Sequence, residues 1–343
     1  MGLFTSLPLL VCALFTVLLA LEWNNRLLRG QRTLLCFMFT TTVLYAGHYV
    51  YFNHNVLLMP YADVAYTAAH LAVYPLYLIY IVRLTSRWHR AWLWLLLPAL
   101  LGAGAQLWAT SQQQEWVDQV RKVVFALEVI ATVAIGSRLI SRYNRMVDQY
   151  YADTEKKSMR NVQNILYLVM VIALLSFAAN TIGRHWFTSH TQLLYVFSAL
   201  FSALLFMIGY AGLHREFSVV DMERDKGVTP DKAVWQQAAA LSNLPLKERI
   251  IRQMEDQKIY LQNDLKLEDL ASIMHTNRTY IYLTLNREMG MSFNEFINRY
   301  RIAHAERLLD SDPTLSATEL AAQSGFASLS SYYRNLKKYK RQN

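Results

Sequence analysis

Basic side chains gather near the end of the chain, where their types suit contacts with nucleic acid. The guanidinium of Arg334 can donate two parallel hydrogen bonds to O6 and N7 of guanine, which makes it the strongest candidate for reading a base. A run of cations follows with no acidic residue between them, as contacts with phosphates require. This run contains Lys337, Lys338, Lys340 and Arg341. The alternative interpretation is a solvated basic tail, with Arg334 buried or bound to phosphate.

An imperfect internal repeat predicts the elements that carry these cations. Residues 265–271 align with residues 315–321, and both copies contain a Leu-Ala pair after an acidic residue. Each copy predicts a short helix, a tight turn and a second helix, which is the pattern of a helix-turn-helix unit. Ser316 and Glu319 predict a capping box at the start of the second unit, whereas Lys266 at the equivalent position predicts a weaker cap in the first.

A longer helix is predicted between the two copies. Ser292 and Glu295 cap its start, and its apolar pattern continues to about Leu309. Roughly 17 residues give a length of about 25 Å. A rod of this length can hold two helices near the roughly 34 Å spacing of successive major grooves. A globule of six or seven helices without a role at nucleic acid is the alternative.

Three motifs in this region resemble the DNA-binding domain of the AraC/XylS (arabinose-regulator) family, over residues 244–343. They are Asn286-Arg287-Glu288-Met289-Gly290-x-Ser292-Phe293, Asn298-Arg299-Tyr300-Arg301-Ile302-x-x-Ala305-x-x-Leu308-Leu309 and Leu320-Ala321-x-x-x-Gly325-Phe326-x-Ser328. The resemblance implies an all-α domain in which a linker helix joins two helix-turn-helix units. It also implies transcription regulation by two recognition helices in adjacent segments of the major groove.

The resemblance places the recognition helices at residues 278–288 and 328–338. The residues that it turns toward the core are Ile281, Leu285, Tyr332 and Leu336. Those that it turns toward the bases are Thr279, Tyr282, Leu283, Ser330 and Arg334, with Arg278 at a phosphate. Leu283 takes the place that matches Arg334, so we expect the first helix to read bases more weakly or to contact thymine methyl groups.

The first part of the chain predicts a membrane domain. The 343 residues are 54% hydrophobic and only 17% charged. Residues 1–214 carry 15 Lys and Arg against 8 Asp and Glu, and residues 215–343 carry 19 against 17. Apolar runs of about 20 residues, the length that crosses roughly 30 Å of hydrocarbon as a helix, occur seven times. They are residues 3–21, 34–52, 62–82, 91–110, 123–140, 162–183 and 191–213.

The loops between these runs predict the orientation. The loops after the first, third and fifth runs, counted with Arg138 at the end of the fifth run, carry 12 Lys and Arg, and those after the second, fourth and sixth carry 3. Because basic loops stay in the cytoplasm, we expect the N-terminus outside and the chain after residue 213 in the cytoplasm, at the inner membrane of a cell. The predicted organisation is all-α: a seven-helix membrane bundle at 1–213, a linker at 214–243 and a double helix-turn-helix domain at 244–343.

Few polar side chains lie within the apolar runs. Glu128 is costly at mid-membrane and predicts a ligand or proton site, or a hydrogen bond to a neighbouring helix. His70, Tyr74 and Tyr77 share one helix face and predict either a pocket of the same sensing site or simple packing.

Motifs for phosphate-loop, zinc-peptidase and serine-hydrolase chemistry are missing, and two cysteines cannot build a Cys-rich zinc site. We therefore predict a protein that is not an enzyme, uses no cofactor and regulates transcription from the membrane. Its predicted partners are double-stranded DNA and the lipid bilayer, with RNA polymerase, a ligand or membrane partner of the bundle and a second copy as further candidates. Two alternatives stay open: a membrane transporter or enzyme whose helical tail binds protein, and a regulator released by proteolysis at 214–232.

Overall fold

The computed structural model describes residues 2–22, 29–53, 57–112, 116–155, 157–182, 191–214, 218–219, 221–222 and 245–341. Most of these residues are helical, with one isolated antiparallel bridge between Tyr151 and Lys266 and no strand among them, which confirms the all-α class. The chain divides into two compact units. Unit 1 is Met1–Ser141 with Met159–Val219, and unit 2 is Arg142–Ser158 with Val220–Asn343. The predicted linker, 214–243, lies almost entirely outside the described residues.

Unit 1 is built from the predicted apolar runs, and each run is helical where it is described. The elements are α1 (Gly2–Leu21), α2 (Arg29–Phe52), α3 (Met59–Thr85), η2 (Arg90–Leu96), α4 (Leu97–Gln112), α5 (Trp116–Tyr150), α6 (Arg160–Ile182) and α8 (Thr191–Leu213). By length and composition, five helices among the described residues are able to cross a membrane. The apolar stretches Leu7–Leu21 of α1 and Arg160–Leu174 of α6 are shorter.

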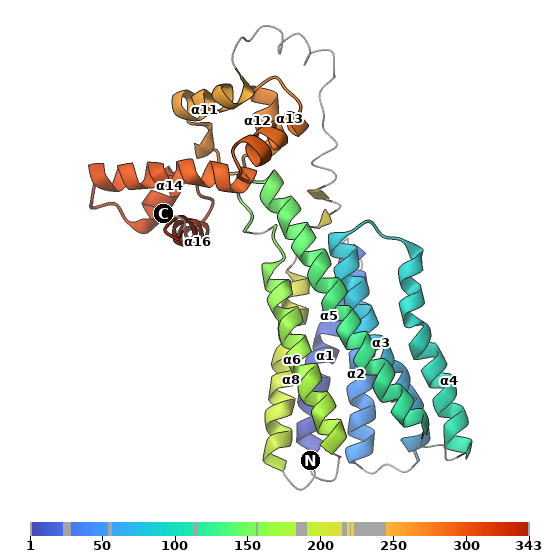
Figure 1. Ribbon diagram of the computed structural model, residues 1–343. Helices are drawn as coiled ribbons and strands as arrows, with labels where there is room; N and C mark the ends of the chain where they lie inside the picture. Colours follow the sequence, from blue (N-terminus) through green and yellow to red (C-terminus); the bar gives the residue numbers. More distant parts are fainter. Residues whose placement is uncertain are drawn as a thin grey trace. The chain divides into compact units, whose positions relative to one another are not determined.

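Glycines let the helices of unit 1 approach closely. Helix α2 packs against α1 and α3, and α1 packs against α8 (Figure 1). A Cβ atom on Gly209 of α8 would lie 2.5 Å from the Phe15 ring, and one on Gly212 would lie 2.2 Å from Leu34. Small residues at such crossings are typical of helix pairs in membranes, where close backbone contact drives association.

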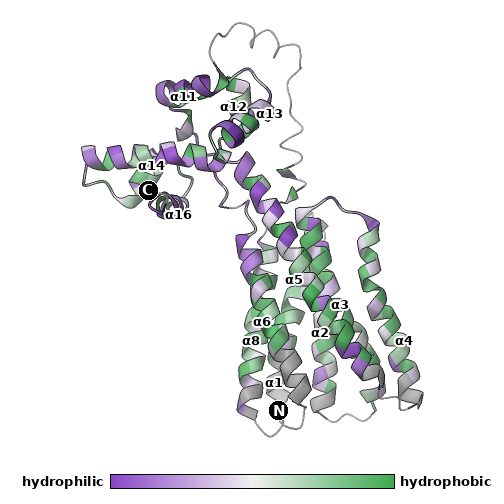
Figure 2. Cartoon of the chain, in the orientation of Figure 1, coloured by the Kyte–Doolittle hydropathy of each residue, from purple (hydrophilic) through white to green (hydrophobic). Residues whose placement is uncertain are grey.

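The outer surface of unit 1 is apolar as well. Leu10 is 64% exposed, Leu100 is 72% exposed and Ile130 is 64% exposed. Figure 2 shows apolar residues along most of the length of these helices. A helix that is apolar on its exposed and buried faces is typical of a membrane span, because lipid rather than water covers it.

Unit 2 contains the two predicted helix-turn-helix units. After α11 (Leu246–Gln257) and η3 (Ile259–Leu261) come α12 (Leu267–Ile273), α13 (Arg278–Leu283) and its continuation η4 (Thr284–Glu288), α14 (Phe293–Ser311), α15 (Ala317–Gln323) and α16 (Leu329–Tyr339). Helix α14 contacts η4 of the first helix-turn-helix unit and α15 and α16 of the second helix-turn-helix unit, as expected of the predicted linker helix (Figure 1). Its 19 residues give a length of about 28 Å.

Helix α5 is longer than its predicted span and carries the chain from unit 1 into unit 2. It has 35 residues and ends at Tyr150, ten residues after the predicted end of the span. Tyr143, Val147 and Tyr150 are buried and follow one another at helical spacing, and no Gly or Pro interrupts them. We call residues 142–158, the end of α5 with the loop that follows it, the α5–α6 segment.

Candidate nucleic-acid interface

The internal repeat extends to the hydrogen bonds of the two turns. The N–H of Thr276 donates to the carbonyl of Ala271 at 2.9 Å, and fifty residues later Phe326 donates to Ala321 at the same distance. The residue before each donor has a left-handed backbone: His275 has φ 48° and Gly325 has φ 80°. The two helix-turn-helix units are therefore copies in backbone geometry as well as in sequence.

Polar caps fix where helices begin in both helix-turn-helix units. The hydroxyl of Ser316 accepts from the N–H of Glu319 at 3.3 Å, and the Glu319 carboxylate accepts from the N–H of Ser316 at 2.9 Å, which confirms the predicted capping box. Hydrogen bonds from Ser316, first from its hydroxyl and then from its N–H, lower the pKa of Glu319. In the first helix-turn-helix unit, Asp269 accepts from the N–H of Lys266 at 2.7 Å. A lysine side chain has no acceptor atom, so it cannot make the second hydrogen bond of a capping box.

A buried arginine ties the linker helix to the rest of unit 2. Arg301 of α14 is fully buried; its Nε donates to the carbonyl of Tyr260 at 2.7 Å and its Nη2 to that of Gln262 at 2.6 Å. Burial lowers the pKa of Arg301 to about 10, and the charges of Asp153 and Asp264 oppose that shift. The sequence motif contains this residue, but only its place on the apolar side of α14 indicates that it is structural.

The first recognition helix is α13 with η4, and its inward face is as predicted. Ile281 and Leu285 are completely buried. Thr279 is exposed, whereas Tyr282 and Leu283 are half-buried. The side chain of Asn277 caps the helix by accepting from the N–H of Thr279 at 2.8 Å. The predicted inward face is confirmed, and contact of Thr279, Tyr282 and Leu283 with bases stays a prediction.

The second recognition helix is α16. Tyr332 is buried in a cluster with Ile302 and Phe326, and Leu336 packs against that cluster, as predicted for the inward face. Ser330 is exposed. Arg334 is half-buried, and its Nη2 is inaccessible and has no hydrogen-bond partner among the described residues. The predicted contact of Arg334 with a base stays a prediction, and it requires that this buried end of the guanidinium becomes accessible.

The predicted phosphate contacts differ in their surroundings. Arg278 forms an ion pair with Glu268 at 3.2 Å, and Lys338 lies 3.7 Å from Glu295. Lys337, Lys340 and Arg341 are exposed. Ion pairs near the surface are weak, so the pairs leave both cations able to exchange their carboxylate partner for a phosphate.

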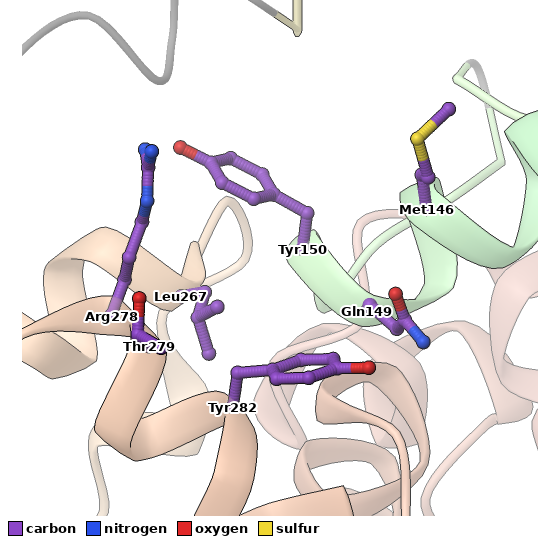
Figure 3. A pocket seen from close by; sticks show the side chains of 7 residues that line it. All are labelled: Met146, Gln149, Tyr150, Leu267, Arg278, Thr279 and Tyr282. Carbon is purple, nitrogen blue, oxygen red and sulfur yellow. The ribbon is translucent and has the colours of Figure 1, made fainter.

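The α5–α6 segment contacts the second recognition helix and lines a pocket with the first, which the sequence did not predict. Ser328 and Ser330, at the start of α16, donate their hydroxyl hydrogens to the carboxylate of Glu155. A pocket of about 190 Å³ lies between the end of α5 and α13, with Tyr150 and Tyr282 reaching into it from different elements (Figure 3). The buried stripe of Tyr143, Val147 and Tyr150 is the sequence signal that could have revealed the helical part of this contact.

Two of the predicted sensing residues of unit 1 meet around one phenylalanine. The ring of His70 stacks on Phe125 with 4.2 Å between centroids, and Tyr74 approaches the same ring edge-on at 5.2 Å. Tyr77 lies apart from them and contacts Phe37 at 5.5 Å. Glu128 follows Phe125 by one turn of α5, and neither of its carboxylate oxygens has a hydrogen-bond partner among the described residues.

Metal ligands do not gather in the described part of the chain: it holds no group of three or more His, Cys, Asp or Glu side chains able to bind an ion.

Comparisons with known proteins identify the C-terminal segment. Residues 270–343 match a family model described as a helix-turn-helix domain, and this segment is an AraC-type helix-turn-helix domain. Uncharacterized HTH-type transcriptional regulators of Staphylococcus aureus strains COL and N315 are each 29% identical to this chain over 86 residues. The similarity covers 25% of this chain and only 11% of either relative. No solved structure matches the chain.

Proposed function

We propose that the chain is a membrane-embedded regulator of transcription that binds specific DNA sequences and couples a signal sensed by its bundle to gene expression. One observation carries the proposal: two helix-turn-helix units, repeated down to the hydrogen bonds of their turns, are joined by one helix of about 28 Å. Two recognition helices held by one rod fit adjacent major grooves better than a single groove.

Unit 1 supplies the membrane part of the proposal. We assign seven spans within residues 1–213, a linker at 214–243 and the DNA-binding domain at 244–343, with the N-terminus outside and the domain in the cytoplasm. The exposed leucines of the bundle and the concentration of Lys and Arg in alternate loops support this arrangement.

The signal is proposed to act where His70 and Tyr74 of α3 meet α5. Phe125 joins these two rings, and Glu128 lies one turn further along α5 with its carboxylate unpartnered in the described residues. A polar group without a partner inside a bundle is costly, so it marks a place where a ligand or a proton changes the balance between helix arrangements.

The proposal is tested by crosslinking the full-length chain to genomic DNA in cells and sequencing the recovered fragments. We expect a discrete set of sites that disappears when residues 244–343 are deleted. Uniform recovery of DNA, or recovery that survives the deletion, would contradict sequence-specific binding by this domain. Flux of a substrate into vesicles that contain the deleted chain would favour a transporter instead.

Arg334 tests base reading within the recovered sites. Replacing it by Ala should cost about 1–3 kcal/mol of binding at sites with a guanine in the contacted position and much less at sites without one. Lys247→Ala, an exposed substitution on α11, is the matched control and should leave both classes of site unchanged. Equal losses of binding free energy at all sites would indicate that Arg334 contacts a phosphate instead of a base.

A further inference from the structure

The α5–α6 segment places a carboxylate against the second recognition helix. Glu155 accepts hydrogen bonds from the hydroxyls of Ser328 and Ser330, and Ser330 is a predicted base-reading residue. Asp153 of the same loop accepts from the hydroxyl of Ser331 at 3.4 Å. These three serines occupy the first turn of α16, where the unpaired N–H groups of the helix favour an anion.

The middle of the segment is fastened to the linker helix. The carbonyl of Ala152 accepts from the side-chain amides of Asn294 and Asn298 at 2.6 and 3.0 Å, and its N–H donates to the carbonyl of Leu265 at 3.1 Å. Tyr151 is buried beside it and pairs with Lys266 in the antiparallel bridge. Both asparagines are themselves buried, so these are contacts that a solvated loop would not make.

The helical end of the segment covers the first recognition helix. Met146, Gln149 and Tyr150 form one wall of the pocket whose other wall contains Thr279 and Tyr282 (Figure 3). Because Thr279 and Tyr282 are predicted to face bases, the wall that the α5–α6 segment forms lies where the edge of a major groove would lie. One segment therefore contacts the second recognition helix and shares a pocket with predicted base-reading residues of the first.

We propose that the α5–α6 segment is an autoinhibitory element that occupies the DNA-reading face and must leave before DNA binds. The proposal rests on the proposed function. Carboxylates on the first turn of α16 take the place that DNA phosphates would take, since serine hydroxyls and helix N-termini are common phosphate contacts. The segment joins α5 to α6, so a rearrangement of those two helices provides a route for a signal to release it.

Removal of the Glu155 charge tests the proposal. The full-length chain in lipid nanodiscs is titrated with a fluorescent duplex of random sequence about 40 base pairs long, which spans both predicted contacts. Glu155→Gln keeps the shape of the side chain and removes the charge that strengthens its hydrogen bonds. We expect its affinity for the duplex to rise about tenfold, because a larger fraction of the chain is then competent to bind.

Asp310→Asn is the matched control, because it removes one negative charge at an exposed position of α14 outside the segment. It should bind as the unchanged chain does. A rise for Asp310→Asn equal to that for Glu155→Gln would mean that net charge alone sets the affinity, and the inference would be wrong.

A reversible disulfide tests the same contact in the opposite direction. Bridge partners such as Tyr151 and Lys266 have Cα atoms about 4.5–5.5 Å apart, which is within the range that a disulfide spans. A chain with Tyr151→Cys and Lys266→Cys, in a Cys36→Ser background, should lose DNA binding when oxidised and regain it when reduced. The return of binding on reduction shows that the variant is folded.

The outcomes distinguish a failure of the autoinhibition proposal from a failure of the proposed function. Equal DNA affinity of the oxidised and reduced chains, or of Glu155→Gln and the unchanged chain, would overturn autoinhibition while leaving DNA binding intact. Absence of DNA binding by every variant, including the reduced double-cysteine chain, would overturn both.

Discussion

At the scale of single residues, the two turn positions of the repeat should differ in their sensitivity to substitution. Gly325 has φ 80°, and a Cβ atom on it would lie 2.6 Å from the Cα of Leu261 and 2.8 Å from the carbonyl oxygen of Tyr260. Gly325→Ala should therefore lower the free energy of unfolding of unit 2 by about 2 kcal/mol or more, since left-handed strain and a backbone clash add.

His275 at the equivalent turn is exposed and has the same left-handed backbone. His275→Gly removes about 1 kcal/mol of strain and adds a similar entropy cost, so the free energy of unfolding should change by less than about 0.5 kcal/mol. Hydrogen exchange of the full-length chain, followed by mass spectrometry in peptides of α12 and α15, measures both effects. Similar losses of protection for the two variants would refute the geometric equivalence of the turns and the crowding at Gly325.

At the scale of elements, the end of α16 should set the salt dependence of DNA binding. Lys337 and Lys340 are exposed near the end of the helix, and each phosphate that they neutralise contributes about 0.9 to the slope of log affinity against log salt. The double variant Lys337→Gln with Lys340→Gln should lower that slope by about 2 and weaken binding equally across sequences. Titrations of the chain with DNA at several salt concentrations measure this slope.

Lys247→Gln on α11 is the control for this measurement, because it removes an exposed cation outside both recognition helices. A slope that falls as much for the control as for one lysine of α16 would assign the effect to net charge. An unchanged slope in the double variant would place these lysines away from the phosphates.

Short-range patterns were enough to predict most elements of the interface. The Ser316 capping box and the cap at Ser292 each depend on residues three positions apart, whereas the burial of Ile281 and Leu285 was implied by the family resemblance. The docking of Glu155 on Ser330 was not predicted, because it joins residues 175 positions apart by hydrogen bonds that leave no periodic signal. The role of Arg301 was not predicted for a related reason: its acceptors are backbone carbonyls, so only its place on the apolar side of α14 indicates that role.

At the scale of the whole molecule, function requires that the helix-turn-helix domain and the basic loops share one side of the membrane. Leu57, which follows α2 and is 85% exposed, is predicted outside. Arg90, which follows α3, and Lys247 of α11 are both exposed and predicted inside. Each is replaced by Cys in a Cys36→Ser background, and intact cells are treated with a maleimide that cannot cross the membrane.

Leu57→Cys should react in intact cells, whereas Arg90→Cys and Lys247→Cys should react only after the membrane is opened. The physical reason is the excess of Lys and Arg in the loops after the first, third and fifth apolar runs, since basic loops tend to stay in the cytoplasm. Reaction of Lys247→Cys from outside would separate the domain from the chromosome, and regulation by the full-length chain would then be impossible. Equal reaction of Leu57→Cys and Arg90→Cys in intact cells would instead contradict a span at α3, because those two positions flank it.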